Sequence, residues 1–491
     1  MDSESPSPLR NLLSKATAKL GVFGLLARIV LGHQLAAIAW LTMKSAFRYK
    51  LFIAIIVALA LIVIGLPMGL KSDGTAQGLT RILLTYTLGS ITVLMAVFTM
   101  WLSCGALARD IDECQIQTLA VKPVARWQIW LGKLIGILTL NAMLLGFAGC
   151  VLVGMIEHRA SQLTVLERQV LENEVLVGRG VVRMPKIDYA PDVEKTYQAM
   201  LLENEAATKE VPEQVAKGSI LAALQAQDEV LPSGHTRVLN LRLTDVKDNL
   251  KDLPLFMKLK FFATKKDKNN VYYLDIVVGP PGATESRSRS VELPANTVNT
   301  ITLPPNLLDD EGNLRIEFSN LNESDLLIPI DGGLEVLFRE HGFAGNFFRG
   351  MAIIFLWLAL LATIGLAASS LLSFPVAAFF SMGVLIVGLS GGTLSSVVEK
   401  GATGASNHET GAVERGLLDP FVVTFFAVTL KIVNLVESFS PIESLSEGRS
   451  ITWGELGKAV FQIGIIMGGF FSGVGMVALT RRELATGQSH M

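Results

Sequence analysis

Six long apolar runs constrain the fold of this chain more than any other feature. They are residues 51–70, 82–103, 134–156, 351–372, 375–398 and 456–480. A helix needs about 20 apolar residues to cross a bilayer, and its backbone groups are then satisfied internally. Only 18% of the residues are charged, against about 25% in soluble domains. We therefore predict a polytopic α-helical membrane protein with six transmembrane helices.

Basic residues predict the orientation of these spans. Seven Lys and Arg residues precede the first run, and Arg481 and Arg482 follow the last. Cytoplasmic flanks carry such an excess, so both termini are expected to be cytoplasmic. The predicted organisation is a tail with an amphipathic interface helix (1–50), spans one to three (51–156), an extracytoplasmic insert (157–348), spans four to six (349–484) and a C-terminal tail (485–491).

A seventh span at 417–436 is the main alternative. Its uninterrupted apolar stretch is short, and Lys431, Asn434 and Glu437 recur on one helical face. A seventh span would also place Arg481 and Arg482 outside. We therefore predict an interfacial helix at 417–437 and retain six spans.

The insert divides into two regions. Helix-forming runs at 192–205 and 214–227 predict a helical region over 157–234. Residues 235–348 contain short alternating runs separated by turn residues, which predict a β-sandwich, jelly-roll-like in character. The expected strands are 237–243, 256–264, 271–278, 300–303, 314–318 and 334–338. Such sandwiches often bind protein or glycan, and the alternative is a rigid spacer or dimer contact.

A charged connector at 104–130 separates the second and third runs. It carries Asp110, Asp112, Glu113, Gln117, Lys122, Pro123, Arg126 and Trp127, followed by Leu131-Gly-Lys133. This order of residues resembles the cytoplasmic coupling segment of ABC-2 type transporter permeases. The family often has a Gly-Thr-Leu-Glu-like run where this chain has Cys114-Gln-Ile-Gln117. The stiff Pro123 and the interfacial Trp127 and Trp130 suit an element that transmits motion, although a solvated loop would look similar.

The resemblance implies how the chain works. It implies a permease subunit in the inner (cytoplasmic) membrane, surrounded by lipid and paired with a second copy or a related permease. A separate ABC ATPase subunit would bind ATP and Mg. Leu131-Gly-Lys-Leu134 lacks the hydroxyl residue and upstream glycine of a phosphate loop, so we expect no enzyme activity and no cofactor in this chain. Export of a lipid-like, amphipathic or polymeric cargo is the expected activity.

Small and hydroxyl residues form a stripe along the second run. The stripe is Thr85, Gly89, Thr92, Ala96, Thr99 and Ser103. Spacings of four and three place these residues on one helix face, where small side chains permit close approach. The stripe is interpreted either as packing within one subunit or as a dimer seam that borders the cargo path.

Other chemistries receive little support from the sequence. Net charge is −2, which argues against a nucleic-acid partner. His408-Glu409 has no second His nearby and predicts a solvated loop rather than a metal site.

Lys133 and Lys458 lie near span ends and are expected to snorkel. The spans therefore carry no charged residue at their midplane, which argues against an ion-coupled carrier. Two alternatives stay open, namely a scaffold that transmits ATPase motion to an envelope partner and a membrane-anchored glycan or protein receptor.

Overall fold

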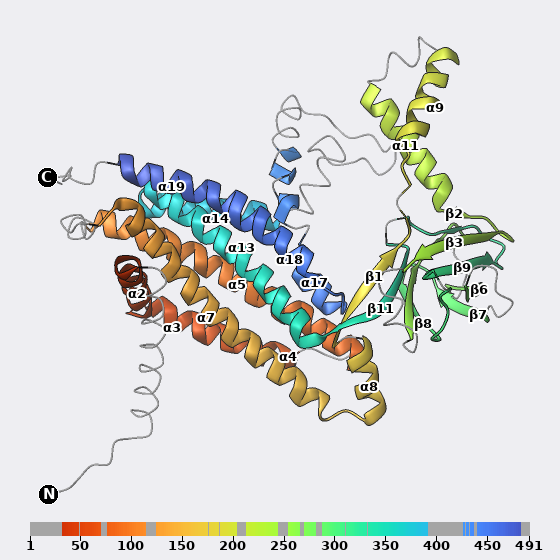
Figure 1. The fold of residues 1–491 in the computed structure, drawn as a ribbon, viewed down its shortest axis with the longest axis horizontal. Helices are drawn as coiled ribbons and strands as arrows, with labels where there is room; N and C mark the ends of the chain where they lie inside the picture. Colours follow the sequence, from red (N-terminus) through yellow and green to blue (C-terminus); the bar gives the residue numbers. More distant parts are fainter. Residues whose placement is uncertain are drawn as a thin grey trace, which may run out of the picture. The chain divides into compact units, whose positions relative to one another are not determined.

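The computed structural model describes the chain in segments. They are residues 32–48, 50–69, 76–113, 124–174, 176–185, 187–203, 213–243, 254–265, 270–280, 287–309, 311–330, 332–390, 426–427, 429–431, 433–436 and 439–482. These residues fall into two compact units, whose helices and strands are labelled in Figure 1. Unit 1 holds the residues up to Leu176 and those from Phe343 onward, and unit 2 is Val177–Gly342.

Unit 1 is built from long apolar helices. In the described part, four are long and apolar enough to cross a membrane, at 29 to 35 residues each. They are Thr80–Asp112 of α5 (Ala76–Asp112), α7 (Arg126–Ala160), α13 (Phe343–Leu371) and the continuous run of α18 (Trp453–Ala459), η3 (Val460–Gly468) and α19 (Gly469–Arg481). At 1.5 Å per residue, each exceeds the hydrocarbon thickness of about 30 Å. The chain is therefore a membrane protein.

The described residues contain fewer candidate spans than the predicted six. α2 (His33–Arg48) meets the helix of α3 (Lys50–Ala60), η1 (Leu61–Gly65) and α4 (Leu66–Gly69) at a bend of 72°. Counting this bent pair as one span gives five. The predicted fifth span is described only as α14 (Phe374–Leu389), whose 16 residues reach about 24 Å. Most of the predicted interfacial helix at 417–437 lies outside the described residues.

The helices extend beyond the apolar runs from which they were predicted. α7 continues to Ala160, and α8 (Val165–Glu174) still belongs to unit 1. The inserted unit therefore begins at Val177 and ends at Gly342 rather than spanning 157–348. The physical reason is that an apolar run ends where the hydrocarbon ends, whereas helical hydrogen bonding continues through polar residues.

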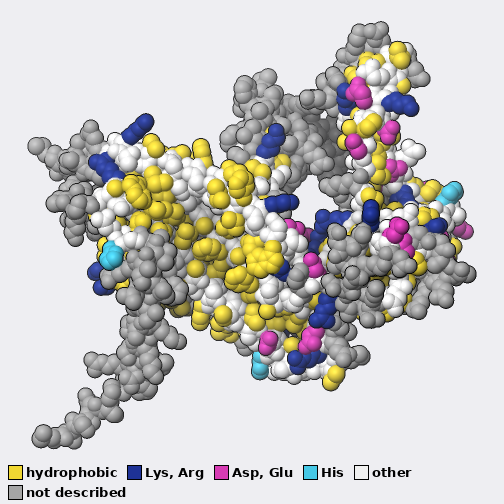
Figure 2. All heavy atoms as spheres, viewed as in Figure 1, with side chains coloured by type: hydrophobic (Ala, Val, Ile, Leu, Met, Phe, Trp, Pro, Cys, Tyr) yellow, Lys and Arg dark blue, Asp and Glu magenta, His cyan; other side chains and the backbone are white. Residues whose placement is uncertain are grey.

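α13 forms the centre of unit 1, packed against α5, α7, α14 and α19. Close approach depends on small residues: a Cβ on Gly365 would collide with the Ser103 side chain, and one on Gly149 would lie 2.8 Å from Met351 Cε. Figure 2 shows hydrophobic side chains along the visible face of these helices and charged side chains toward their ends. This distribution fits helices that are surrounded by lipid.

Unit 2 contains antiparallel sheets. The strands are β1 (Val177–Arg183), β2 (Val230–Leu231), β3 (Thr236–Arg242), β4 (Leu255–Lys260), β5 (Phe262–Ala263), β6 (Val271–Gly279), β7 (Arg287–Pro294), β8 (Val298–Leu303), β9 (Asn313–Asn320), β10 (Leu326–Leu327) and β11 (Leu334–Gly342). Two four-stranded sheets have the orders β1-β11-β4-β8 and β3-β9-β6-β7, and a short sheet has β2-β10-β5. The two larger sheets contribute to one apolar cluster that includes Met257, Val336, Leu274 and Ile316.

All six predicted strands are confirmed, since each overlaps a strand of the structure. Alternation marks β9 most clearly, because Leu314, Ile316 and Phe318 are fully buried. The sequence missed β1, which lies in the region predicted to be helical, because its Val177-Gly-Arg-Gly180 start has weak strand propensity. It also missed β7, whose polar Arg-Ser repeat suits an edge strand that pairs only with β6.

The two predicted helices of the insert are confirmed as α9 (Ala190–Glu203) and α11 (Glu213–Glu229). They share an apolar cluster, and the Tyr189 hydroxyl donates to Asp228 Oδ2 at 2.7 Å beside it. Burial and the neighbouring Asp228 raise the pKa of Tyr189 to about 12. Tyr189 therefore stays protonated and keeps donating to Asp228 at physiological pH.

We predict that Gly180→Ala destabilises unit 2 by about 1–3 kcal/mol. A Cβ at Gly180 would overlap the ring of Phe338 on the paired strand β11. Urea-dependent limited proteolysis of the purified chain, followed with antibodies to unit 2, measures the loss. Gly342→Ala is the control, because its Cβ would meet nothing within 4 Å. Equal stability of the two variants would contradict the predicted contact.

Candidate functional site

The predicted coupling residues gather where α5 ends and α7 begins. Asp110 and Asp112 lie in the last turns of α5, with Glu113 directly after it, and Arg126 and Trp127 open α7. The charged connector is therefore not separate from the second span at its start, because the helix of that span continues through Asp110 and Asp112. Gln117, Lys122 and Pro123 lie outside the described residues.

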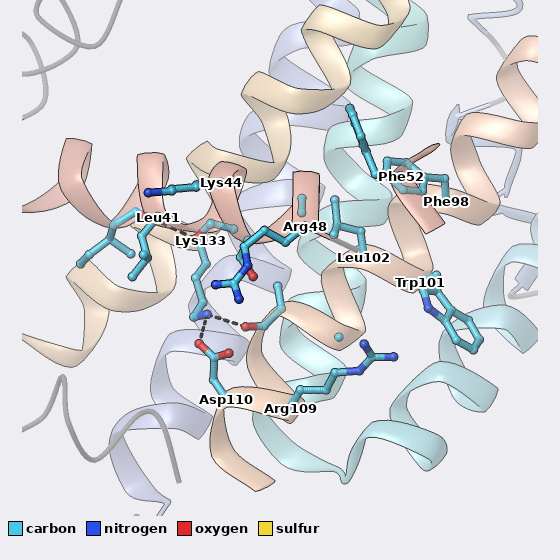
Figure 3. A pocket seen from close by; sticks show the side chains of 16 residues that line it. Leu41, Lys44, Arg48, Phe52, Phe98, Trp101, Leu102, Arg109, Asp110 and Lys133 are labelled. Atoms are coloured by element: carbon cyan, nitrogen blue, oxygen red, sulfur yellow. Dashed lines mark hydrogen bonds and ion pairs between the residues drawn. The ribbon is translucent and has the colours of Figure 1, made fainter. Parts of the chain in front are cut away.

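Lys133 and Asp110 join the two helices at this end. The Lys133 ammonium donates to Asp110 Oδ2 at 2.5 Å and to the Ala106 carbonyl (Figure 3). Lys133 is 5% exposed, so the expectation that it snorkels to water is wrong. A buried ammonium requires a charged partner, and the Asp110 carboxylate on the adjacent helix supplies it.

Arg126 caps a different helix. Its Nη1 donates to the carbonyls of Leu479, Thr480 and Arg482 at 3.3, 2.7 and 3.1 Å, at the end of α19. These carbonyls have no partner within the helix, and a cation there also favours the helix dipole. Arg482 in turn donates to the carbonyls of Ser369 and Ser370 near the end of α13. Arg126 therefore has a structural role, in addition to any docking role.

Trp130 and Trp127 have opposite environments. Trp130 was expected at the membrane interface, but it is fully buried. Its indole fits against Gly475 of α19, where a Cβ would lie 2.8 Å from Nε1. Trp127 is 46% exposed. Residues three apart share a helix face, so the difference comes from α19, which packs against Trp130.

Arg126 is exposed, but its guanidinium is engaged at the end of α19. Asp112, Glu113 and Trp127 are the other exposed members of the predicted set among the described residues. They lie next to the Asp110–Lys133 pair and the Arg126 cap, which together hold α5, α7 and α19. A partner that binds these exposed side chains would act on three fastened helices. Among the described residues, no group of three or more His, Cys, Asp or Glu side chains could hold a metal ion.

The small-residue stripe of α5 contains both buried and exposed residues. Thr92, Ala96, Thr99 and Ser103 are buried inside unit 1, whereas Thr85 is exposed. Gly89 is half-buried. The buried members pack within the chain, which favours the packing interpretation for most of the stripe. Only the Thr85 end remains available to a neighbouring subunit or to lipid.

A polar contact inside the bundle escaped the sequence analysis. The Thr99 hydroxyl donates to Asn141 Oδ1 at 3.1 Å, and both residues are fully buried. Asn141 was the available signal, because it is the one amide within the apolar run 134–156. Hydrogen bonds of this kind stabilise helix pairs in membranes, so this contact joins α5 to α7 within the membrane region.

Comparisons with known proteins return nothing: no family model, characterised protein or solved structure matches the chain.

We predict that Asp110 and Lys133 depend on each other for stability. Asp110→Asn should lower unfolding stability by about 2 kcal/mol or more, because it leaves a buried ammonium unpaired. Lys133→Met should cost less, since the Asp110 side chain is 26% exposed, and the double variant should recover part of the loss.

The thermal unfolding midpoint in mild detergent measures all three variants. The exposed ion pair Arg168–Glu172 provides the matched control. Arg168→Met and Glu172→Gln should each change the unfolding stability by less than about 0.5 kcal/mol. Strictly additive effects at Asp110 and Lys133 would contradict the coupling.

We predict that Gly475→Ala destabilises the contact between α19 and α7 by about 1–3 kcal/mol. The new methyl group would lie within 3 Å of three Trp130 ring atoms, so the indole must move. Thermal unfolding and the tryptophan emission maximum report the change. Gly473→Ala, two residues away, meets nothing within 4 Å and should leave both readouts unchanged or slightly improve stability.

Proposed function

We propose that this chain is the membrane-spanning permease subunit of an ABC-2 type transporter. It works in the inner membrane with both termini in the cytoplasm, as one of two permease copies or paralogues. A separate ABC ATPase binds ATP and Mg and supplies the motion. The cargo is lipid-like, amphipathic or polymeric and moves outward. Support comes from the resemblance of residues 109–135 and from the geometry of the same segment.

The observation that carries the proposal is the Asp110–Lys133 pair. It fastens the end of α5 to α7 at 2.5 Å, directly beside the exposed Asp112 and Glu113. A force applied by an ATPase at these acids acts on both helices together, since a buried charge pair resists separation. A solvated loop would dissipate the same force, so this fastening is what a coupling element needs.

Six spans and a jelly-roll sandwich belong to the same proposal. Six spans require that the predicted fifth run, 375–398, of which α14 is the described part, crosses the membrane. For unit 2, support comes from the order of its eight long strands, which alternate between two four-stranded sheets as jelly rolls do. This domain would contact cargo, an envelope protein or a glycan.

A scaffold that transmits motion is the second candidate. β11 ends at Gly342 and α13 begins at Phe343, so no loop separates strand from helix. Movement of α13 would therefore pass directly along the chain into unit 2. The receptor alternative has weaker support. A glycan-binding surface would be supported by neighbouring exposed aromatic rings, but Tyr272 is buried and only Tyr273 of this pair is exposed.

Co-purification tests the ATPase assignment. The tagged full chain is expected to retain an ABC ATPase in stoichiometric amount, and Asp112→Lys with Glu113→Lys should reduce its recovery about tenfold, the effect expected of like charge at an interface. Arg126 is left intact, because its removal would loosen α19. Asp192→Lys with Glu323→Lys, two exposed acids of unit 2, is the charge-matched control and should retain the ATPase.

A wild-type chain that stays folded and purifies without any ATPase would refute the proposal. If the ATPase is present, transport and transmission are separated by measuring ATP-dependent export from inverted vesicles. Insertion of a flexible Gly-Ser linker between Gly342 and Phe343 should spare transport but abolish transmission to unit 2.

A further inference from the structure

A pocket of about 660 Å³ opens beside the Asp110–Lys133 pair, within the size range of small-molecule sites (Figure 3). Its walls come from α2, α3, α5 and α7, all in unit 1. The pocket exists because α2 and the following helix diverge by 72°. α2 lies close against α7, while Phe52 of α3 leans toward Phe98 of α5 at a ring distance of 6.5 Å.

The polar wall of the pocket is strongly basic. It carries Lys44, Arg48, Arg109 and Lys133 against the single carboxylate of Asp110. Asp110 pairs with Lys133, and the Arg109 guanidinium lies 4.3 Å from the ring centre of Phe374. Lys44 and Arg48 form no ion pair with any other described residue, and in Figure 3 Arg48 extends from α2 toward Lys133 and Asp110. The wall therefore has an excess of positive charge.

The opposite wall is apolar. Phe52 and Phe98 are buried, whereas Trp101 is 41% exposed. Arg109 and Asp110 lie near the end of a helix of 33 residues, about 50 Å long and thus well beyond the hydrocarbon core. The basic wall is consequently at headgroup depth, and Trp101 and Phe98 lie about two to three helical turns farther along α5. An occupant must be anionic at one end and apolar at the other.

We propose that this pocket binds an anionic membrane lipid through its phosphate-bearing headgroup. Arg48 and Lys44 contact the phosphate, for which the guanidinium fork and the ammonium are suited. The acyl chain lies along Phe98 and Trp101. Binding requires no ATPase partner, so the site stands independently of the proposed transport activity.

Lipid binding by the full chain in mild detergent tests the site. Native mass spectrometry compares phosphatidylglycerol with phosphatidylcholine of the same acyl chains. We expect the wild type to prefer phosphatidylglycerol about tenfold, and Arg48→Gln with Lys44→Gln to abolish that preference. Lys458→Gln is the control, since it removes an exposed basic charge outside the pocket, and the preference should persist.

Two further measurements identify the source of the phosphate. Phosphatidylglycerol with brominated acyl chains should quench tryptophan emission in the wild type and markedly less in Trp101→Phe. Inorganic phosphate and glycerol 3-phosphate should fail to displace the lipid at millimolar concentration. Displacement of the bound lipid by either anion at millimolar concentration would overturn the lipid assignment. Equal binding of both lipids by the wild type, or an unchanged preference in the double variant, would overturn the site itself.

Discussion

The buried ammonium of Lys133 is the constraint around which one end of the helical unit is arranged. In a membrane protein such a charge must find its partners in the protein, and here they come from Asp110 and the Ala106 carbonyl of the neighbouring helix. This requirement keeps α5 helical well past its apolar run and holds it beside α7. The Arg126 cap and the Trp130 contact then add α19 to the same end. The exposed acids, the pocket and the proposed coupling role all depend on this arrangement.

Periodic and local features were readable from the sequence. Apolar runs located the long helices, and alternation in stretches such as 314–318 located the strands, because both depend on residues close together in the chain. Partners that are distant in sequence could not be predicted. β1 is a strand because β11, more than 150 residues later, pairs with it. Trp130 is buried because Gly475 leaves room for its indole, which no local pattern around Trp130 indicates.

The candidate site shows the same division. The sequence selected the correct segment of the chain but assigned several side chains by type alone. Asp110 and Arg126 were expected to face a partner, yet both are engaged within the chain. Lys133 was expected to reach water, because a lysine near a span end usually does so. Which charged residues remain exposed is decided by tertiary neighbours, so Asp112 and Glu113 became the sharper targets only with the structure.

The close seating of α2 on α7 has one more consequence. Gly132 and Gly136 leave so little room that an added Cβ would lie 2.8 Å from Ile38 and 2.7 Å from the Ala39 carbonyl. The spacing between α2 and α7, which both line the pocket, therefore contributes to its width. Width and charge are thus separate variables. Exchanges at Lys44 or Arg48 can change which ligand is chosen at constant width, whereas a methyl group at Gly132 can change the size of ligand admitted while every lining residue stays the same.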